Sequence, residues 1–200
     1  MILEHDGHRP RIHPSAYVAP NAVVCGDVSV GADVRVLFGA VLTAEGGAIE
    51  VGERSIVMEN SLVRGRGGHA TAIGRSVLLG PHSHVNGAVV EDEAFIATGA
   101  AVFPGARIGK GAEVRVHGVV HVNAQVAPGT VVPIGWVAVG DPARLFSPDQ
   151  HEELWRVQRD ADFPGTVFGL AREEATMDRV TARYAELFGR HRTDRFLDGA

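Results

Sequence analysis

Three histidines in the middle of the chain have the chemistry and spacing of a metal site. His82 and His84 are two residues apart, and on a strand two such side chains point to the same side. His69, in the glycine-rich loop 64–70, could supply a third imidazole across a subunit contact. Neutral imidazole is a common ligand of zinc and other divalent metals. The alternative interpretation is that these histidines are exposed, or bonded to the backbone at an interface.

A second set of side chains could bind a small anionic molecule. Each member directly follows a valine of the repeat described below, so the members should stack in one column: Arg64, Asn86, Phe103 and His121. In such a column a guanidinium pairs with a carboxylate, an amide orients it, and an aromatic ring covers its apolar part. Arg64 could instead form an ion pair with Glu45 or Glu59 of a neighbouring subunit, which is a structural role.

A six-residue repeat must position these side chains. Twenty aliphatic residues keep this spacing, with three and then four extra residues between runs and one residue skipped after the third run: Ile12, Val18, Val24, Val30, Val36, Leu42; Val51, Val57, Val63; Ile73, Leu79, Val85; Val90, Ile96, Val102, Ile108, Val114, Val120, Val126, Val132. Three hexads make one triangular coil of eighteen residues, which adds about 4.8 Å along the axis. A helix would need a period of about 3.6 residues. The sequence therefore predicts an all-β solenoid with one shared core.

The repeat ends after residue 143, and the rest of the chain has helical patterns. Ser147, followed by Pro148 and Gln150, predicts a helix that starts at this serine. Apolar residues on one face predict a second helix over 172–188. We expect a β-helix domain over 1–146 and a helical segment over 147–200 that packs on the solenoid and caps its end, where it shields open strand edges.

The composition limits the class of protein and its partners. Of the 200 residues, 45% are hydrophobic, which is typical of a globular core. The formal net charge of −5 disfavours a nucleic-acid partner. Cys25 is the only cysteine, so the chain has no internal disulfide and fits a reducing compartment. The acidic start is unlike a signal peptide and no segment is long enough to cross a membrane, so we expect a cytoplasmic protein without a membrane partner.

Several features resemble the γ-class carbonic anhydrases of the hexapeptide-repeat superfamily. They are the hexads that end in Val139–Ala143, the C-terminal helix, and the strings Ser55–Asn60 and Val85–Gly87. The resemblance covers roughly residues 12–146 and includes the skipped residue after Val85. It implies a left-handed parallel β-helix and a homotrimer. It also implies a zinc or iron ion held between subunits by three histidines, two from one subunit and one from its neighbour.

The residues at the implied ligand positions depart from this family. The hexads align the three ligands with Arg64, Pro81 and Asn86, and none of these is histidine. A guanidinium stays protonated and has no lone pair to give, and proline has no donor side chain. Thr43 and Met58 stand where the resemblance implies an arginine and a glutamine. The usual zinc site therefore cannot form at these positions, and without metal, water is a poor nucleophile at neutral pH.

We therefore expect a γ-carbonic-anhydrase-like homotrimer whose interface pocket binds or transforms a small carboxylate-like ligand, without the usual zinc-dependent CO2 hydration. The candidate catalytic residues are Glu45, Glu59, Arg64 and Asn86. The candidate ligand-binding residues are Arg64, His82, His84, Asn86 and Phe103. Zinc or another divalent metal would bind only at the relocated site formed by His69, His82 and His84. Two alternatives stay open: a non-catalytic scaffold or assembly subunit, and a hexapeptide acyltransferase that uses acyl-CoA with His69 as its base.

Overall fold

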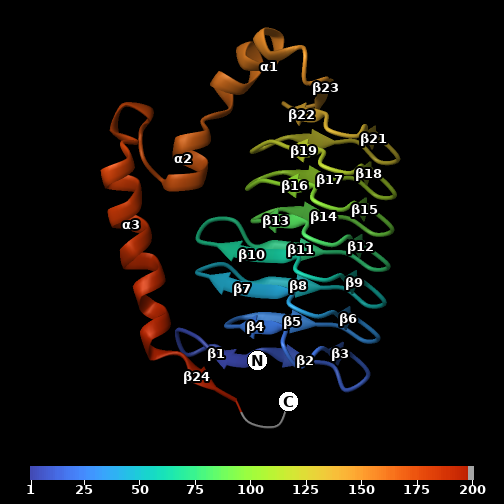
Figure 1. Ribbon diagram of the computed structural model, residues 1–200, viewed down its shortest axis with the longest axis vertical. Coiled ribbons are helices and arrows are strands. Elements are labelled where there is room, and N and C mark those ends of the chain that lie inside the picture. Colours follow the sequence, from blue (N-terminus) through green and yellow to red (C-terminus); the bar gives the residue numbers. More distant parts are fainter. Residues whose placement is uncertain (198–200) are drawn as a thin grey trace.

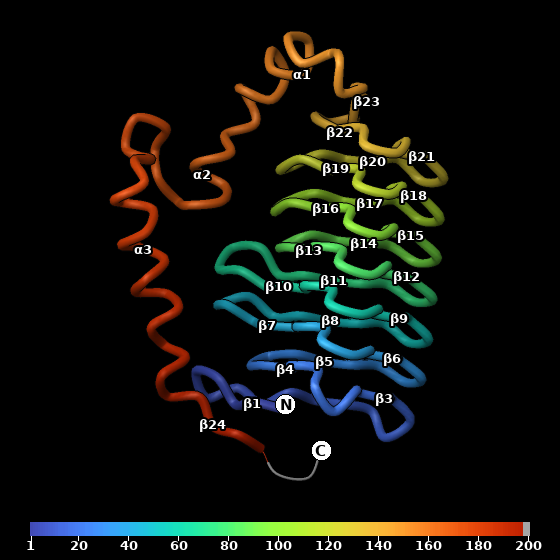
Figure 2. The backbone as a smooth tube through the Cα atoms, in the orientation of Figure 1, coloured from blue at the N-terminus to red at the C-terminus, as the bar shows by residue number. Residues whose placement is uncertain are grey.

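The chain winds into a triangular stack of parallel strands, as the six-residue repeat predicts. The computed structural model describes residues 1–197. The strands form three sheets along the stack, one of ten strands and two of seven (Figure 1). Figure 2 shows the backbone rising coil by coil, after which the C-terminal segment runs back beside the stack. This architecture confirms the predicted all-β solenoid with C-terminal helices.

Each sheet takes one strand from each coil, so its strands are far apart in sequence. The ten-stranded sheet contains β1 (Ile2–Glu4), β4 (Val23–Cys25), β7 (Val41–Glu45), β10 (Leu62–Arg66), β13 (His84–Asn86), β16 (Ala101–Val102), β19 (Val119–Val120), β22 (Val137–Val139), β23 (Arg144–Phe146) and β24 (Arg195–Phe196). One seven-stranded sheet contains β2 (Arg11–Ile12), β5 (Val28–Val30), β8 (Ile49–Val51), β11 (Thr71–Ile73), β14 (Val89–Val90), β17 (Arg107–Ile108) and β20 (Gln125–Val126). The other contains β3 (Tyr17–Val18), β6 (Arg35–Val36), β9 (Ile56–Val57), β12 (Leu78–Leu79), β15 (Phe95–Ile96), β18 (Glu113–Val114) and β21 (Val131–Val132).

The aliphatic residues of the repeat form the core. Every one of them from Val24 to Val132 is buried, while Ile12 and Val18 in the first coil are partly buried. Full burial of one such side chain stabilises the fold by about 1.5–3 kcal/mol relative to exposing it. Because side chains alternate across a strand, the neighbours of each core residue must point outward. The core therefore fixes which residues face the outside of each sheet.

The pairing of the strands shows where one residue of the repeat is skipped. Val85 of β13 pairs with Val102 of β16, seventeen residues later. Val90 of β14 pairs with Ile108 of β17, eighteen residues later. One coil is therefore one residue short between Val85 and Val90, which confirms the break in the repeat.

The C-terminal segment follows a different path from the one predicted. Its helical elements are α1 (His151–Gln158), η1 (Arg159–Ala161), α2 (Phe163–Phe168), η2 (Arg172–Glu174), α3 (Met177–Gly189) and η3 (Arg190–Thr193). Only α1 caps the end of the stack, where Leu154 packs against Val139 and Phe146. Helix α3 runs down the side of the solenoid, and β24 then pairs antiparallel with β1 (Figure 1). Helix α1 therefore covers the end of the stack, whereas α3 lies along its side.

Both helices also begin later than predicted. The predicted contact between Gln150 and Ser147 exists, since the Ser147 N–H donates to Gln150 Oε1 at 3.0 Å, but it lies in a turn and α1 begins only at His151. In α3 the capping side chain is that of Thr176, which accepts from the N–H of Arg179. None of the helices within residues 1–197 has the length and hydropathy of a bilayer-spanning segment.

Candidate functional site on the ten-stranded sheet

The predicted column of side chains exists on the ten-stranded sheet. Arg64 is paired in register with Asn86 of the next strand and with Thr43 of the previous one. The pairings of β16 with β13 and β19 place Phe103 and His121 further along the same column. The rings of Phe103 and His121 lie 6.4 Å apart. Stacked coils thus bring together residues that are distant in the chain.

Polar atoms on this face are buried without partners. Six side-chain nitrogen or oxygen atoms have no hydrogen-bond partner within residues 1–197: Arg64 Nε, Asn86 Oδ1, His84 Nε2, Glu45 Oε2 and both ring nitrogens of His121. All five residues lie on strands of this sheet or directly after one. Buried polar groups in proteins are nearly always hydrogen-bonded, and leaving one unpaired costs about 1–3 kcal/mol. These unpaired polar atoms make the ten-stranded sheet the candidate site.

A cavity of about 350 Å³ opens between the sheet and the end of α3. Its walls include Cys25, Thr43, Glu45, Arg64, Phe188 and His191. The Arg64 guanidinium lies over the ring of Phe188, with Cζ 5.5 Å from the ring centroid. Across the described part of the chain, no carboxylate forms an ion pair with Arg64. A larger open groove of about 910 Å³ lies on a seven-stranded sheet, but none of the unpartnered buried atoms line it, so we place the site at the smaller cavity.

The four candidate catalytic residues are not all together. Glu45 ends β7 and lines the same cavity as Arg64, and Asn86 is the register neighbour of Arg64. Glu45 Oε1 accepts from Thr43 Oγ1 at 2.7 Å. Glu59 lies in the turn after β9, on another sheet, and does not line the cavity. Glu45, Arg64 and Asn86 therefore share the ten-stranded sheet, and Glu59 does not.

His82 lies at a corner of the solenoid and not on the strand. It is exposed and has a φ of 57°, in the left-handed region. Asn60 and His117 occupy the same hexad position and also have positive φ. The two-residue spacing rule for strands therefore does not apply between His82 and His84. A corner position, three residues after each core aliphatic, is the signal that would have shown this.

The histidines predicted as metal ligands do not form a ligand group within one chain. His84 lies on β13, and its ring centroid is 6.1 Å from that of Phe103. His69 closes a tight turn in which its backbone pairs with Arg66. Among residues 1–197 no group of three potential ligands includes His69, His82 or His84. A site shared across subunits stays a prediction.

Burial favours the neutral form of two imidazoles on the ten-stranded sheet, those of His84 and His121. It lowers the pKa of His84, and the nearby guanidiniums of Arg64 and Arg66 lower it further. It also lowers the pKa of His121. A neutral imidazole has one donor and one acceptor nitrogen, so each ring can either donate or accept a hydrogen bond.

Aromatic rings hold the C-terminal segment over this face. Neighbouring rings contact one another along it in the order Phe163, Phe168, Tyr184, Phe188. Phe163 joins this series to the sheet, because its ring lies 5.9 Å from Phe103 and 5.7 Å from His121. Aromatic pairs at such distances stabilise by about 0.5–1.5 kcal/mol beyond their burial. The segment therefore forms one wall of the site.

Sequence reasoning missed a cluster that lines part of the cavity. Cys25 and Asp194 lie beside His5 and His191, which come from opposite ends of the chain. Burial, reinforced by Asp194, raises the pKa of the Cys25 thiol to about 12. No spacing in the sequence signals this cluster, because it depends on where the C-terminal segment returns.

Comparison with known proteins gives relatives along most of the chain. No protein-family model matches it. It is 34% identical over 158 residues to "Gamma carbonic anhydrase 1, mitochondrial" of Arabidopsis thaliana, an alignment that covers 76% of this chain and 55% of the relative. It is 25% identical over 179 residues to a carbonic anhydrase of Geobacillus kaustophilus, covering 88% and 95% of the two chains. The chain spans about half the length of the two plant relatives that it matches over 158 residues.

The structure of a hexapeptide transferase family protein from Anaplasma phagocytophilum has the same fold. Its TM-score is 0.52 at 22% identity, and the match covers 92% of this chain and 97% of that one. At this identity the likeness shows the fold alone, which is that of a left-handed hexapeptide-repeat β-helix.

Proposed function

We propose that this chain, which is similar to γ-class carbonic anhydrases along most of its length, forms a homotrimer with a non-standard interface pocket. In this proposal the pocket lies around Arg64 and Asn86 and binds or transforms a small carboxylate-like anion. The observation that carries it is the set of buried, unpartnered polar atoms on the ten-stranded sheet. A second subunit and a ligand together would supply their partners.

The chemistry of these atoms favours an anion. Arg64 offers only donors, carries a permanent positive charge and forms no ion pair within residues 1–197. A carboxylate offers only acceptors, and its hydrogen bonds to a guanidinium are roughly twice as strong as neutral ones. The amide of Asn86 can orient the ligand from the neighbouring strand. The free Oε2 of Glu45 in the cavity wall can accept a hydrogen bond from a hydroxyl of the same ligand.

The usual zinc ion does not fit the positions implied by the resemblance. Arg64 has no lone pair for a metal, and its buried Nε is a donor in need of an acceptor. Pro81 has no donor side chain, which leaves Asn86 as a single weak oxygen ligand. We therefore assign no step to zinc at this place, and we expect the protein to lack zinc-dependent CO2 hydration. A relocated metal at His69, His82 and His84 of adjoining subunits, and a cytoplasmic location, stay predictions.

The test combines mass, binding and activity. Light scattering on the purified full chain should give three times the 21.2 kDa mass. Calorimetry with acetate, bicarbonate and a hydroxy acid should show saturable binding, with chloride at equal ionic strength as the control. Stopped-flow measurement with added zinc should show no rapid CO2 hydration. A monomer, or rapid zinc-dependent hydration, would refute the proposal.

Two further outcomes would point to the alternatives. A trimer that binds no carboxylate would indicate a non-catalytic assembly subunit. Saturable binding of coenzyme A would indicate an acyltransferase. No feature of the cavity favours that activity, since His69 lies in a tight turn rather than at the tip of a long loop.

A further inference from the structure

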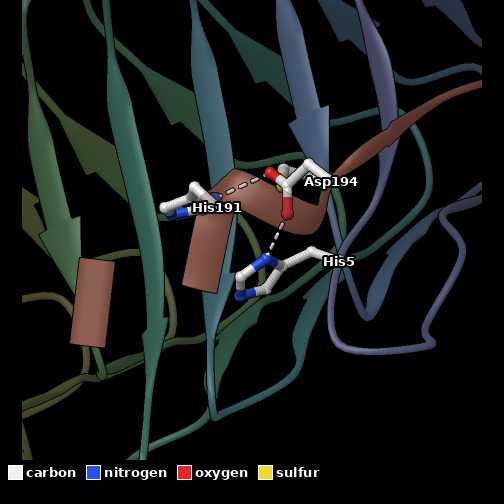
Figure 3. A group of neighbouring side chains, drawn as sticks. His5, His191 and Asp194 are labelled. Atoms are coloured by element: carbon white, nitrogen blue, oxygen red, sulfur yellow. Dashed lines mark hydrogen bonds and ion pairs between the residues drawn. The ribbon is translucent and has the colours of Figure 1, made fainter. Parts of the chain in front are cut away.

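Four potential metal ligands meet where the two ends of the chain come together. His5 follows β1, Cys25 ends β4, His191 lies in η3, and Asp194 follows η3. One ligand atom from each lies within 4.8 Å of all the others. Figure 3 shows the Asp194 carboxylate between the two imidazoles, with one oxygen facing each ring. This cluster is separate from the three histidines that the sequence suggested as ligands.

Two of the distances within the cluster are hydrogen-bond distances, and the third is that between two ligands of one zinc ion. His5 Nδ1 lies 2.6 Å from Asp194 Oδ1, and His191 Nδ1 lies 2.7 Å from Asp194 Oδ2. Cys25 Sγ lies 3.6 Å from Asp194 Oδ2. Zinc bonds of about 2.0–2.3 Å place the ligand atoms of a tetrahedron about 3.3–3.8 Å apart. Side-chain movements of about 1 Å would therefore convert the observed cluster into a tetrahedral site.

The orientation of the His5 and His191 rings also suits metal binding. Both rings turn Nδ1 toward the centre of the cluster, and both have a carboxylate on the far side. His191 Nε2 lies 3.0 Å from Glu45 Oε1, and His5 Nε2 lies 3.7 Å from Asp6 Oδ2. A metal-bound histidine almost always donates its other N–H to a carboxylate, a carbonyl or water, which fixes the ring and raises its basicity. Here the outer acid lies at hydrogen-bond distance for His191, and at 3.7 Å, beyond that distance, for His5.

Burial and charge also suit a divalent ion. The side chain of His5 is 2% exposed and that of Asp194 is 12% exposed, whereas His191 is 33% exposed and leaves a route for entry. A thiolate and a carboxylate together would neutralise the charge of a divalent cation. A metal-free hydrogen-bond network is the competing explanation. In that network the thiol makes one contact with the other three residues, to Asp194 Oδ2 at 3.6 Å.

We propose that His5, Cys25, His191 and Asp194 bind one divalent transition metal ion per chain, with zinc as the best match to two nitrogens, one sulfur and one oxygen. The ion joins the first coil to the returning C-terminal segment. It stabilises the folded chain by mass action, because the ligands are apart in the unfolded chain. Cys25 and His191 also line the cavity of Arg64, so the ion lies at the edge of that cavity. This proposal does not depend on the function of the interface pocket.

The test uses cobalt(II) as a spectroscopic substitute for zinc. The full chain, stripped with a chelator, should bind one cobalt per chain and show a sulfur-to-cobalt charge-transfer band with tetrahedral visible bands. Zinc should displace the cobalt and raise the unfolding temperature. Cys25→Ser should abolish the charge-transfer band and weaken metal binding by more than about 100-fold, beyond the 10–100-fold typical of losing an outer partner. Asp194→Asn should weaken binding in the same direction.

The control is the double variant His82→Ala and His84→Ala, which removes the candidate interface ligands. It should keep the stoichiometry and the charge-transfer band of the native chain. Circular dichroism of each metal-free variant shows whether it folds. The number of metal ions per chain is measured on the native chain, so it does not depend on the folding of any variant. Absence of stoichiometric binding by the stripped native chain would overturn the proposal. A charge-transfer band that survives in Cys25→Ser, or disappears in the double variant, would overturn it as well.

Discussion

Replacing Arg64 by methionine separates the two roles open to its guanidinium. Arg64 Nε is buried without a partner in the described chain, and the guanidinium lies over the ring of Phe188. If Arg64 binds an anion in the pocket, the replacement weakens binding and leaves the fold intact. If Arg64 pairs with Glu45 or Glu59 of a neighbouring subunit, the replacement leaves a buried carboxylate unpaired and damages the assembly.

The two roles predict free energies of different size. A hydrogen bond between charged groups is worth about 1.5–3 kcal/mol, so loss of the guanidinium should weaken anion binding about 10- to 150-fold. The lost contact with Phe188 costs about 0.5–1 kcal/mol, but a methionine sulfur near the same ring recovers about 0.3–1.5 kcal/mol. The free energy of unfolding should therefore change by less than about 1 kcal/mol. Breaking a buried ion pair would instead cost about 3–5 kcal/mol.

The assay measures both quantities on the same preparations. Calorimetry with acetate gives the affinity, and denaturant unfolding with light scattering gives stability and assembly. Arg107→Met is a matched control, because Arg107 is exposed on a seven-stranded sheet and pairs with Glu91. This variant should change the affinity less than twofold, as expected for an exposed pair far from the cavity. Unchanged acetate binding by Arg64→Met, or a loss of 3 kcal/mol or more in stability, would refute our assignment of Arg64.

Three further predictions concern the burial of His121, the packing at Gly74 and the ring contacts of Phe163. Burial lowers the pKa of His121 in the folded chain, so the unfolded chain binds the proton first as the pH falls. The contribution of His121 to the free energy of unfolding should be complete above about pH 6.5 and should decline below it by at most about 1.4 kcal/mol per pH unit. His121→Phe should flatten this decline in unfolding curves measured between pH 7.5 and 5. An identical pH dependence in both proteins would contradict this. Gly74→Ala would place a methyl group 2.6 Å from the backbone nitrogen of Asp92, so we expect a loss of about 1–3 kcal/mol in thermal unfolding, whereas Gly67→Ala meets no atom within 4 Å and should change stability by less than about 0.5 kcal/mol. Phe163→Ala removes the ring that joins the C-terminal segment to the sheet, so it should cost about 1–2 kcal/mol and make that segment cleavable by protease under conditions where the native chain resists. Equal cleavage of both chains would show that the ring is not the attachment.

The repeat could be predicted in detail because burial at each sixth position is strict. A polar residue at Val63 or Ile96 would have no route to water, so the aliphatic spacing reports the core directly. Strand register then follows from the spacing, including the short coil after Val85. The column of Arg64 and Asn86 could be predicted for the same reason.

The rest of the site depends on contacts that the spacing does not encode. The apolar face of α3 indicates that the helix packs on something, but it does not say on which sheet. The meeting of His5 with His191 depends on that choice. The error at His82 has a local cause, since the corners of many hexads, that of His82 included, adopt a left-handed backbone that strand periodicity ignores. Sequence periodicity therefore predicts each coil well and the path of the tail poorly.

The return of the tail from the last coil to the first limits how the chain can change in length. Helix α3 lies along the stack, and the pairing of β24 with β1 ties its far end to the opposite end of the solenoid (Figure 1). Duplicating one coil would lengthen the stack by about 4.8 Å. The tail would then need about three more helical residues, at 1.5 Å each, to reach β1 again. In a repeat protein without such a tail, the number of units is not limited by a contact between its two ends. Here the length of the tail must match the height of the stack, which ties the chain to one number of coils.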